Sequence, residues 1–182
     1  MIPIKPHAYA ELAQDFYNLQ NWQGFNNPLL VIENAELKKE LGLENIERQK
    51  LLDIFNGSLS IENLRPLSMA YSGHQFGQYV EQLGDGRGLL FGQIDSSEGS
   101  IDIHLKGAGK TPFSRFGDGR AVLRSVIREY LCGEAMHALS IPTSRALMII
   151  GSDEIVIREK SETAAMLIRT AKTHIRLSLI HI

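Results

Sequence analysis

Residues 84–129 carry the feature that most constrains the fold: a glycine-rich turn, a strand and a helix in a fixed order. The turn reads Gly84-Asp85-Gly86-Arg87-Gly88, and the strand-like run 101–106 ends in Lys106. A helical segment that carries Glu129 follows. Glycine lets the backbone approach an anion closely, and a lysine held by a carboxylate presents a fixed positive charge. This order therefore predicts a site that can hold the phosphates of a nucleotide.

Two strands are predicted after the glycine turn from their composition and from the alternation of apolar and polar residues. Runs 89–95 and 100–105 flank the turn 96–99 and indicate an antiparallel hairpin. In the second run alternate residues share a face, with Ile101, Ile103 and Leu105 on one side and Asp102, His104 and Lys106 on the other. Lys106 therefore stands at the end of a strand, opposite the apolar row.

The next element is predicted to be a helix over 119–139, with Asp118 as its N-cap. Its apolar stripe is expected to comprise Val122, Leu123, Val126, Ile127, Tyr130 and Leu131. Glu129 lies beside this stripe, 129 minus 106 or 23 residues after Lys106, so it can point toward the sheet and pair with the lysine. Arg120, Arg124 and Arg128 recur every four residues, either as a solvated face, which is favoured, or as a phosphate-binding ladder.

Further elements are predicted on both sides of this stretch. Helices are expected over 9–19, over 35–41 with Asn34 as N-cap and Gly42 as stop, and over 46–55; strands are expected over 29–32, 146–150, 154–158 and 165–170. The run 66–80 mixes glycines, aromatics and amides without periodicity and predicts an irregular segment. Within it, His74 is either a hydrogen-bonded structural residue, which is favoured, or a catalytic base.

Composition narrows the classes of partner. The 182 residues suffice for one domain with a core, and a net charge of −2 favours neither nucleic acid nor an anionic membrane as partner. Cys132 is the only cysteine, so the sequence offers neither an intramolecular disulfide nor a cysteine-based zinc cluster. The N-terminus lacks a signal-peptide pattern, and no run approaches the roughly 18 apolar residues that a membrane helix needs. A cytoplasmic location is expected.

Two familiar phosphate motifs fit the sequence poorly. The run 107–111 ends in Gly-Lys-Thr as a P-loop does, but the pattern needs a glycine where His104 stands, and Pro112 follows at once. The glycines at 84, 86 and 88 do not form the G-x-G-x-x-G of a dinucleotide fold, and β-like sequence follows them. The order of glycine turn, lysine strand and glutamate helix instead matches a protein kinase small lobe. We therefore predict an α+β fold with an antiparallel sheet and one helix equivalent to the kinase αC helix.

One short motif recurs, since Gly84-Asp85-Gly86-Arg87 returns as Gly117-Asp118-Gly119-Arg120. Both copies place glycine-freed amides beside an arginine, which would give two anion-facing turns, and chance recurrence is the competing explanation.

Several long motifs together resemble one family. They are Tyr71-Ser72-Gly73-His74-Gln75-Phe76-Gly77, Gln82-Leu83-Gly84-Asp85-Gly86-Arg87, His104-Leu105-Lys106-Gly107-Ala108-Gly109, Gly117-Asp118-Gly119-Arg120-Ala121-Val122-Leu123-Arg124, Ile127-Arg128-Glu129, Glu134-Ala135-Met136, Ile141-Pro142-Thr143 and Arg169-Thr170-Ala171-Lys172-Thr173-His174-Ile175-Arg176. In this order they resemble the selenoprotein O family of protein adenylyltransferases, which have a pseudokinase fold. The resemblance covers roughly residues 67–176.

The resemblance implies a kinase-like fold that binds ATP and transfers AMP to Ser, Thr or Tyr hydroxyl groups of protein substrates. It implies ATP contacts from Gly84, Gly86, Arg87, Lys106, Asp118, Gly119, Arg169 and Arg176, with Glu129 as the ion-pair partner of Lys106. Mg²⁺ or Mn²⁺ would bridge the phosphates. The family's catalytic aspartate and metal ligands lie beyond residue 182, so none is assigned within this chain, and the chain alone is expected to be an inactive fragment.

Three segments are expected: a mostly helical N-terminal extension over 1–66, a kinase-like nucleotide-binding lobe over 67–176, and a non-native tail over 177–182. The tail can be encoded by CTG TCT CTT ATA CAC ATC, which resembles a transposase adapter used in sequencing libraries. A native stop codon after Ile182 in the source locus would refute this expectation. Two other functions stay open for the parent protein: a true kinase of the same fold, and a nucleotide-binding module without catalysis.

Overall fold

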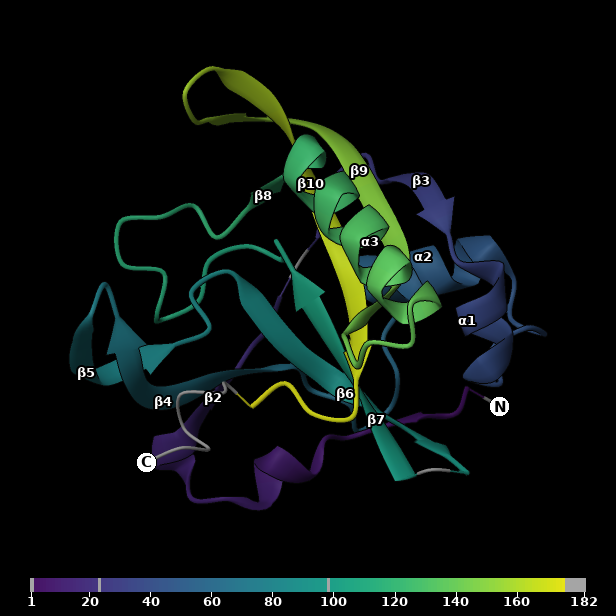
Figure 1. Cartoon of the computed structure of the whole chain (residues 1–182), viewed down its shortest axis with the longest axis horizontal. Helices are drawn as coiled ribbons and strands as arrows, with labels where there is room; N and C mark the ends of the chain where they lie inside the picture. The colour runs from purple at the N-terminus through teal and green to yellow at the C-terminus, as the bar shows by residue number, and fades with distance from the viewer. Residues whose placement is uncertain (1, 23, 98, 176–182) are drawn as a thin grey trace.

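The computed structural model describes residues 2–22, 24–97 and 99–175 (Figure 1). Its elements are β1 (Ile4–Lys5), η1 (Ala8–Glu11), η2 (Gln14–Phe16), β2 (Tyr17–Leu19), β3 (Leu29–Glu33), α1 (Ala35–Glu40), α2 (Arg48–Asn56), β4 (Leu67–Gln75), β5 (Gln78–Gly84), β6 (Gly88–Ser96), β7 (Gly99–Lys106), β8 (Ala121–Val122), α3 (Leu123–Ala138), β9 (Arg145–Ile157) and β10 (Ser161–Ala171). The described strands form one antiparallel sheet in the order β2-β4-β6-β7-β10-β9-β3, with β1 on β6, β5 on β4 and β8 on β10. An antiparallel sheet with few helices confirms the predicted α+β class.

The centre of the sheet brings distant parts of the chain together. The predicted hairpin of β6 and β7 is confirmed, with Leu90 paired to His104. On its other side β7 pairs with β10, which sets Arg169 opposite His104. Cross-strand neighbours of this kind lie close enough for their side chains to interact. A residue near the end of the described chain therefore reaches the strand that carries Lys106.

Helices cover both faces of this sheet. On one face α3 crosses β9 and β10 (Figure 1), and its fully buried Val126 packs with Ile149 and Leu167. On the other face α2 inserts Leu51 and Phe55, which have no exposed surface, into the main core. Full burial of one such side chain contributes roughly 1.5–3 kcal/mol. The middle of β7 and the middle of β10 are therefore buried on both faces of the sheet.

The predicted start of the long helix was wrong. Helix α3 begins at Leu123 with Val122 as an N-cap that makes no side-chain hydrogen bond, so Asp118 is not the cap. Residues 121–122 instead form β8, which pairs with β10. Gly119 has a φ of +72°, which breaks a helical path before it can start there. The apolar stripe was also too wide, since Leu131 is 61% exposed.

The segment 66–80 was predicted to be irregular and is instead the hairpin of β4 and β5. Its two-residue connection is Phe76-Gly77, with φ values of +54° and +77°. Two successive residues with positive φ are the geometry that joins twisted antiparallel strands tightly. Phenylalanine is an uncommon residue at such a position, so the turn has no signal in composition. His74 lies on β4 against Tyr79, with ring centroids 5.5 Å apart.

The N-terminal part agrees with the prediction in its second half only. Asn34 caps α1 by accepting from the Leu37 N–H at 3.0 Å, Gly57 ends α2 in the left-handed region, and β3 lies where a strand was expected. The helix predicted over 9–19 is wrong: two short 3₁₀ turns and the strand β2 occupy that range. The strands predicted over 146–150 and 154–158 are one continuous strand, β9.

The described part of residues 1–66 also shares the sheet and core of the rest of the chain, through the pairing of β1 with β6, β2 with β4 and β3 with β9. The boundary at residue 66 stays a prediction. Within the described ranges, no helix combines the length and the apolar character that crossing a membrane requires.

Candidate functional site

A cleft of about 1100 Å³ opens at the end of β5, β7 and β10. Its walls are the glycine turn 84–88, the loop 112–120 and the hairpin residues Ile157 and Arg158. Seven of the residues predicted to contact ATP line this one cleft: Gly84, Gly86, Arg87, Lys106, Asp118, Gly119 and Arg169. The eighth, Arg176, lies outside the described residues. Nucleotide contact by these residues stays a prediction, but the fold brings them together.

Lys106 and Arg169, which both line the cleft, share the carboxylate of Glu129. Lys106 Nζ is bound to Glu129 Oε2, and Arg169 Nη1 donates to Glu129 Oε1 at 3.1 Å. The strand therefore directs Lys106 toward α3, and the helix directs Glu129 back toward the sheet. The predicted pairing of Lys106 with Glu129 is present, and Arg169 joins it from β10.

The charges in this cluster do not cancel. Burial alone would raise the pKa of Glu129, but the hydrogen bond from Lys106 and the charge of Arg169 together hold it below its ordinary value. One ionised carboxylate thus faces two cations, which leaves an excess of positive charge. Within the described part of the chain, Nε of Arg169 is buried and has no hydrogen-bond partner. A buried donor without an acceptor lowers the stability of the fold.

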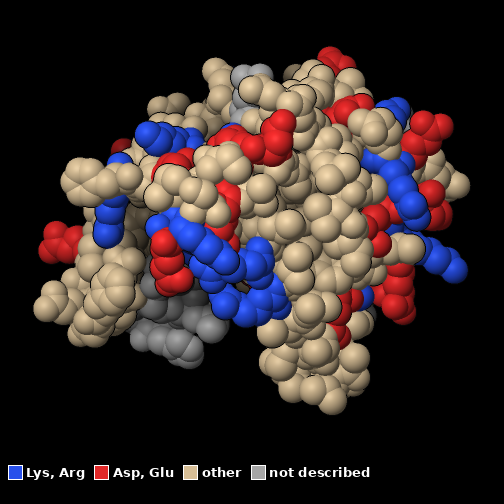
Figure 2. All heavy atoms as spheres, turned by 90° about the horizontal axis from the view of Figure 1, so that it is seen from above, with Lys and Arg blue, Asp and Glu red and all other residues tan. Residues whose placement is uncertain are grey.

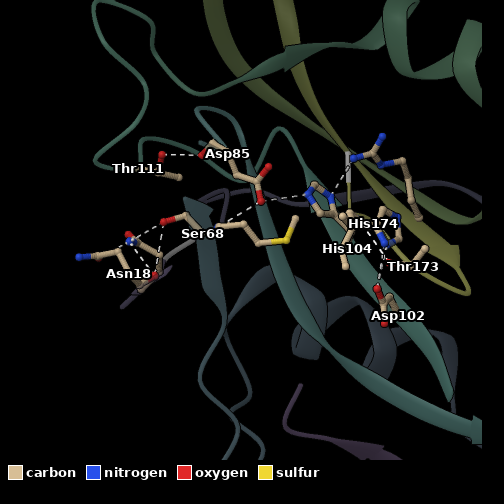
Figure 3. A network of polar contacts seen from close by, with 12 residues as sticks. Asn18, Ser68, Asp85, Asp102, His104, Thr111, Thr173 and His174 are labelled. Atoms are coloured by element: carbon tan, nitrogen blue, oxygen red, sulfur yellow. Dashed lines mark hydrogen bonds and ion pairs between the residues drawn. The ribbon is translucent and has the colours of Figure 1, made fainter. Parts of the chain in front are cut away.

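A buried histidine connects this cluster to the glycine turn (Figure 3). Arg169 Nη2 lies 3.0 Å from His104 Nδ1, and His104 Nε2 lies 3.8 Å from Asp85 Oδ2. Burial and the charge of Arg169 lower the pKa of His104 well below its usual value, so the ring is neutral. Burial raises the pKa of Asp85 to about 6, although the Met69 N–H and the Arg169 charge oppose that shift.

A second buried carboxylate, that of Asp102, lies on the same face of β7 as His104. Asp102 accepts from the His174 N–H at 3.0 Å, from Gln93 Nε2 at 3.0 Å and from His7 Nε2 at 2.8 Å. Burial would raise its pKa, but the hydrogen bonds from His174 and His7 hold that pKa well below its usual range. The rings of His174 and His104 stack with centroids 4.9 Å apart (Figure 3). His7, before β2, and His174, after β10, are thereby bound to the strand of Lys106.

The second Gly-Asp-Gly-Arg turn forms the opposite wall of the cleft. Asp118 accepts two hydrogen bonds from Arg158, at 2.7 and 2.8 Å, and these lower its pKa. Arg120 donates to both oxygens of Glu154 at 2.9 Å and to the Ala108 carbonyl at 3.0 Å. Bidentate pairs of this kind fix an arginine rigidly. The turn is therefore held by β9 and does not begin a helix.

The arginines at positions 120, 124 and 128 do not form a ladder. Arg120 precedes α3, Arg124 pairs with Glu162 at 2.6 Å, and Arg128 is exposed. Seen from above, Lys and Arg atoms gather in the middle of one face with Asp and Glu atoms directly against them (Figure 2). His74 is exposed and is not among the residues that line the cleft.

The sequence did not predict the roles that five residues have in or beside the cleft: Asp85, His104, Thr111, Ser114 and Arg158. One signal was present, because the alternation in β7 placed His104 and Asp102 on the same face as Lys106. Three polar residues in a row on one face of a central strand indicate a polar network where helices cover the sheet. Arg158 carried no such signal, since its partner Asp118 lies 40 positions away.

Comparison with known proteins decides the family. A family model described as "Protein adenylyltransferase SelO" matches residues 5–181. The chain belongs to the SelO family. Among its relatives, this SelO chain is 53% identical over 171 residues to "Protein nucleotidyltransferase YdiU" of Vibrio parahaemolyticus, covering 93% of this chain and 35% of that protein.

Two further relatives carry the same name. The SelO chain is 54% identical over 170 residues to the protein of Vibrio vulnificus, covering 92% of this chain and 35% of the relative. It is 48% identical over 173 residues to the protein of Thioalkalivibrio sulfidiphilus, covering 93% of this chain and 35% of that relative. The chain thus spans about a third of the length of these relatives.

Proposed function

We propose that the protein to which this chain belongs is an ATP-dependent protein adenylyltransferase, and that this chain is the part that holds the nucleotide. The relatives are named protein nucleotidyltransferases, and the matching family is described as a protein adenylyltransferase. The chain would correspond to the small lobe of a kinase-like fold, with β5 to β7 as its glycine-turn strands and α3 as its αC-like helix.

One observation carries this proposal. Lys106 and Arg169 line a cleft that the glycine turn borders, and both bind the single carboxylate of Glu129. A pair of oriented cations with only one anion between them attracts and positions a polyphosphate. Among the described residues, Arg87, Lys106, Arg115, Arg120, Arg158 and Arg169 line the cleft against Asp85 and Asp118. The cleft therefore suits an anionic ligand of the size of a nucleoside triphosphate.

The proposed reaction moves AMP. The hydroxyl oxygen of a Ser, Thr or Tyr side chain in a protein substrate attacks the α-phosphorus of ATP. A new oxygen–phosphorus bond forms, the bond to the bridging oxygen of the β-phosphate breaks, and pyrophosphate leaves with that electron pair. A base outside this chain takes the hydroxyl proton. Lys106 and Arg169 would neutralise charge on the phosphates while the glycine turn holds them in line.

Mg²⁺ or Mn²⁺ is implied by the family and would neutralise phosphate charge when bound. Within residues 2–22, 24–97 and 99–175, no three His, Cys, Asp or Glu side chains gather in a way that could hold a metal ion. The described residues alone do not fit a metal centre.

The first alternative is a kinase that transfers the γ-phosphoryl group with the same Lys106 and Glu129. The full-length protein and a protein acceptor, incubated separately with α-labelled and γ-labelled ATP, distinguish the two. AMP transfer leaves label on the acceptor only from the α position. Label retained only from the γ position would overturn the proposal in favour of the kinase.

The second alternative is a nucleotide-binding module without catalysis. The open reading frame beyond residue 182 tests it, because transfer needs an aspartate and metal-binding side chains there. A complete gene without them would favour the module. In that case ATP binding to the full-length protein by calorimetry would persist while no label reaches an acceptor.

A further inference from the structure

The connection between β7 and β8 contains the Gly-Lys-Thr run that resembles a P-loop ending but does not form one. Instead it loops out and closes on itself, with the Gly109 N–H donating to the Gly119 carbonyl at 3.1 Å. Residues 111–114 of this loop, which we call the strap, run back along the glycine turn. Thr111 ends the run that resembles a P-loop, but in this structure its side chain binds the glycine turn.

Two hydroxyl groups of the strap bind the backbone of the turn. Thr111 Oγ1 donates to the Asp85 carbonyl at 2.6 Å, and Ser114 Oγ donates to the Gly86 carbonyl at 2.5 Å. Figure 3 shows the contact of Thr111 with Asp85. Each hydroxyl is itself oriented: Ser114 Oγ accepts from the Thr111 N–H at 2.8 Å, and Thr111 Oγ1 accepts from the Phe113 N–H at 3.1 Å. The donors are therefore preset toward the turn.

These contacts fix the direction of two amide groups. A trans peptide is planar, so its N–H points opposite to its carbonyl. Because the Asp85 and Gly86 carbonyls face the strap, the N–H groups of Gly86 and Arg87 face away from it. In the described part of the chain, neither N–H is bonded to an acceptor in the protein. Both residues line the cleft, where such donors suit an anion.

The strap also explains the glycines of the turn. A Cβ atom on Gly84 would lie 2.2 Å from Cγ of Phe113, and one on Gly86 would lie 2.7 Å from the Phe113 carbonyl oxygen. Neither glycine has a positive φ. Glycine is needed at these two positions because the strap packs against them, and not because the backbone is left-handed.

We propose that Thr111 and Ser114 are positioning residues for the nucleotide: their hydroxyls hold the glycine turn so that the Gly86 and Arg87 amides face the phosphates. The inference rests on the proposed nucleotide site. Because each hydroxyl donates its proton to a carbonyl of the turn, the two residues act through the turn. In this way the loop after β7 sets the affinity of a turn that lies more than twenty residues before it.

The test uses the full-length protein with Thr111→Val, Ser114→Ala and both together. Thr111→Val keeps the shape of the side chain and removes the donor. Loss of one such donor is expected to raise the KM for ATP by about three- to tenfold, and loss of both by at least about tenfold, with kcat changed less than about threefold. Thr111→Ser, which keeps the hydroxyl, is expected to restore the wild-type KM.

Thr143→Val is the matched control, because it also removes a threonine hydroxyl bonded to a backbone carbonyl, that of Ser144 at 3.4 Å, but outside the cleft. It is expected to leave the KM unchanged. The binding of ATP and of inorganic tripolyphosphate, followed by calorimetry, provides a second readout that does not depend on turnover. Both ligands are expected to bind the double variant more weakly by the same factor.

Three results would overturn the inference. The first is a double variant that binds ATP as the wild type does, and the second is Thr111→Ser that behaves like Thr111→Val. The third is a wild type that binds neither ATP nor tripolyphosphate, which would overturn the proposed function as well. A wild type that binds ATP but transfers no AMP would refute only the transfer, since the affinities still decide on the strap. If the double variant fails to fold, the comparison of Thr111→Val with Thr111→Ser shows whether the hydroxyl of Thr111 contributes to ATP affinity.

Discussion

Arg169 donates from Nη2 to Nδ1 of the buried His104 across a distance of 3.0 Å. An arginine can only donate, so Nδ1 is the acceptor and the proton of the neutral ring is on Nε2. That proton points toward Asp85, whose Oδ2 lies 3.8 Å away. His104 thereby orients a cation of the cleft with one nitrogen and faces the glycine turn with the other. Its neutrality matters, because a protonated ring could not accept from Arg169.

His104→Leu is expected to lower the stability of the protein by about 1–3 kcal/mol, because Arg169 loses a buried acceptor. His104→Asn places a side-chain oxygen near the position of Nδ1 and is expected to recover most of this loss. Urea unfolding at neutral pH measures both. If the two variants are equally destabilised, the hydrogen bond to Arg169 is not what His104 contributes.

Glu129→Gln is expected to weaken ATP binding at least about tenfold, because a charge-assisted contact that holds Lys106 and Arg169 becomes a neutral one. Lys106→Ala is expected to weaken it in the same way by removing the cation itself. Calorimetry on the full-length protein measures the affinities. Glu162→Gln is the control, since Glu162 also pairs with an arginine at 2.6 Å, but that arginine, Arg124, does not line the cleft. Equal affinities for wild type and Lys106→Ala would remove Lys106 from the site.

Sequence predicts the parts of the site that depend on the regular spacing of residues within one strand or one helix. Alternation in β7 fixed the face of Lys106, and the helical period put Glu129 toward the sheet, so their contact followed from two local rules. The strand predicted directly after the glycine turn is β6. Arg169 was expected at the site only from the family resemblance, because no local rule states which strand lies next to β7.

The parts that were missed depend on contacts between distant segments. His7 meets Asp102 across 95 residues, and Thr111 meets Asp85 across 26. Neither contact changes a hydrophobic period, so neither is visible in a window of sequence. The hairpin of β4 and β5 was missed for another reason: its turn places Phe76 at a positive φ, where glycine or asparagine is the usual signal. The helix predicted from 119 failed because pairing of β8 with β10 overrode local preference.

The pKa of Asp85 predicts how stability changes with pH. It is raised to about 6 from an ordinary 3.8, so between these values the folded state binds a proton that the unfolded state releases. The contribution of Asp85 to stability is therefore full below about pH 4 and lost as the pH rises through 6, by up to about 3 kcal/mol. Asp85→Asn is expected to be more stable than wild type at pH 7 and equal to it at pH 4.

Urea unfolding of both proteins at intervals from pH 4 to pH 7 measures this difference, and groups common to both cancel. Asp95→Asn is the contrasting control, because hydrogen bonds from Lys5 and Ser100 lower the pKa of Asp95. Its wild-type carboxylate stabilises the fold at higher pH and loses that effect as the pH falls, which is the opposite trend. A difference between wild type and Asp85→Asn that stays constant with pH would contradict the shift.

Gly84→Ala tests why glycine is needed at this position. Either the neighbouring Phe113 leaves no room for a Cβ atom, or the backbone of Gly84 adopts a conformation that only glycine allows. Its new Cβ would lie 2.2 Å from the Phe113 ring, so destabilisation of about 1–3 kcal/mol is expected from overpacking. Gly117→Ala is the matched control in the opposite wall of the cleft, since its nearest neighbour would be the Ser114 carbonyl oxygen at 3.1 Å. If crowding is the cause, Phe113→Ala should relieve it, and the two substitutions together should cost less than their sum. Additive losses would mean that Gly84 is required by its own backbone, and the packing of the strap would not account for the turn.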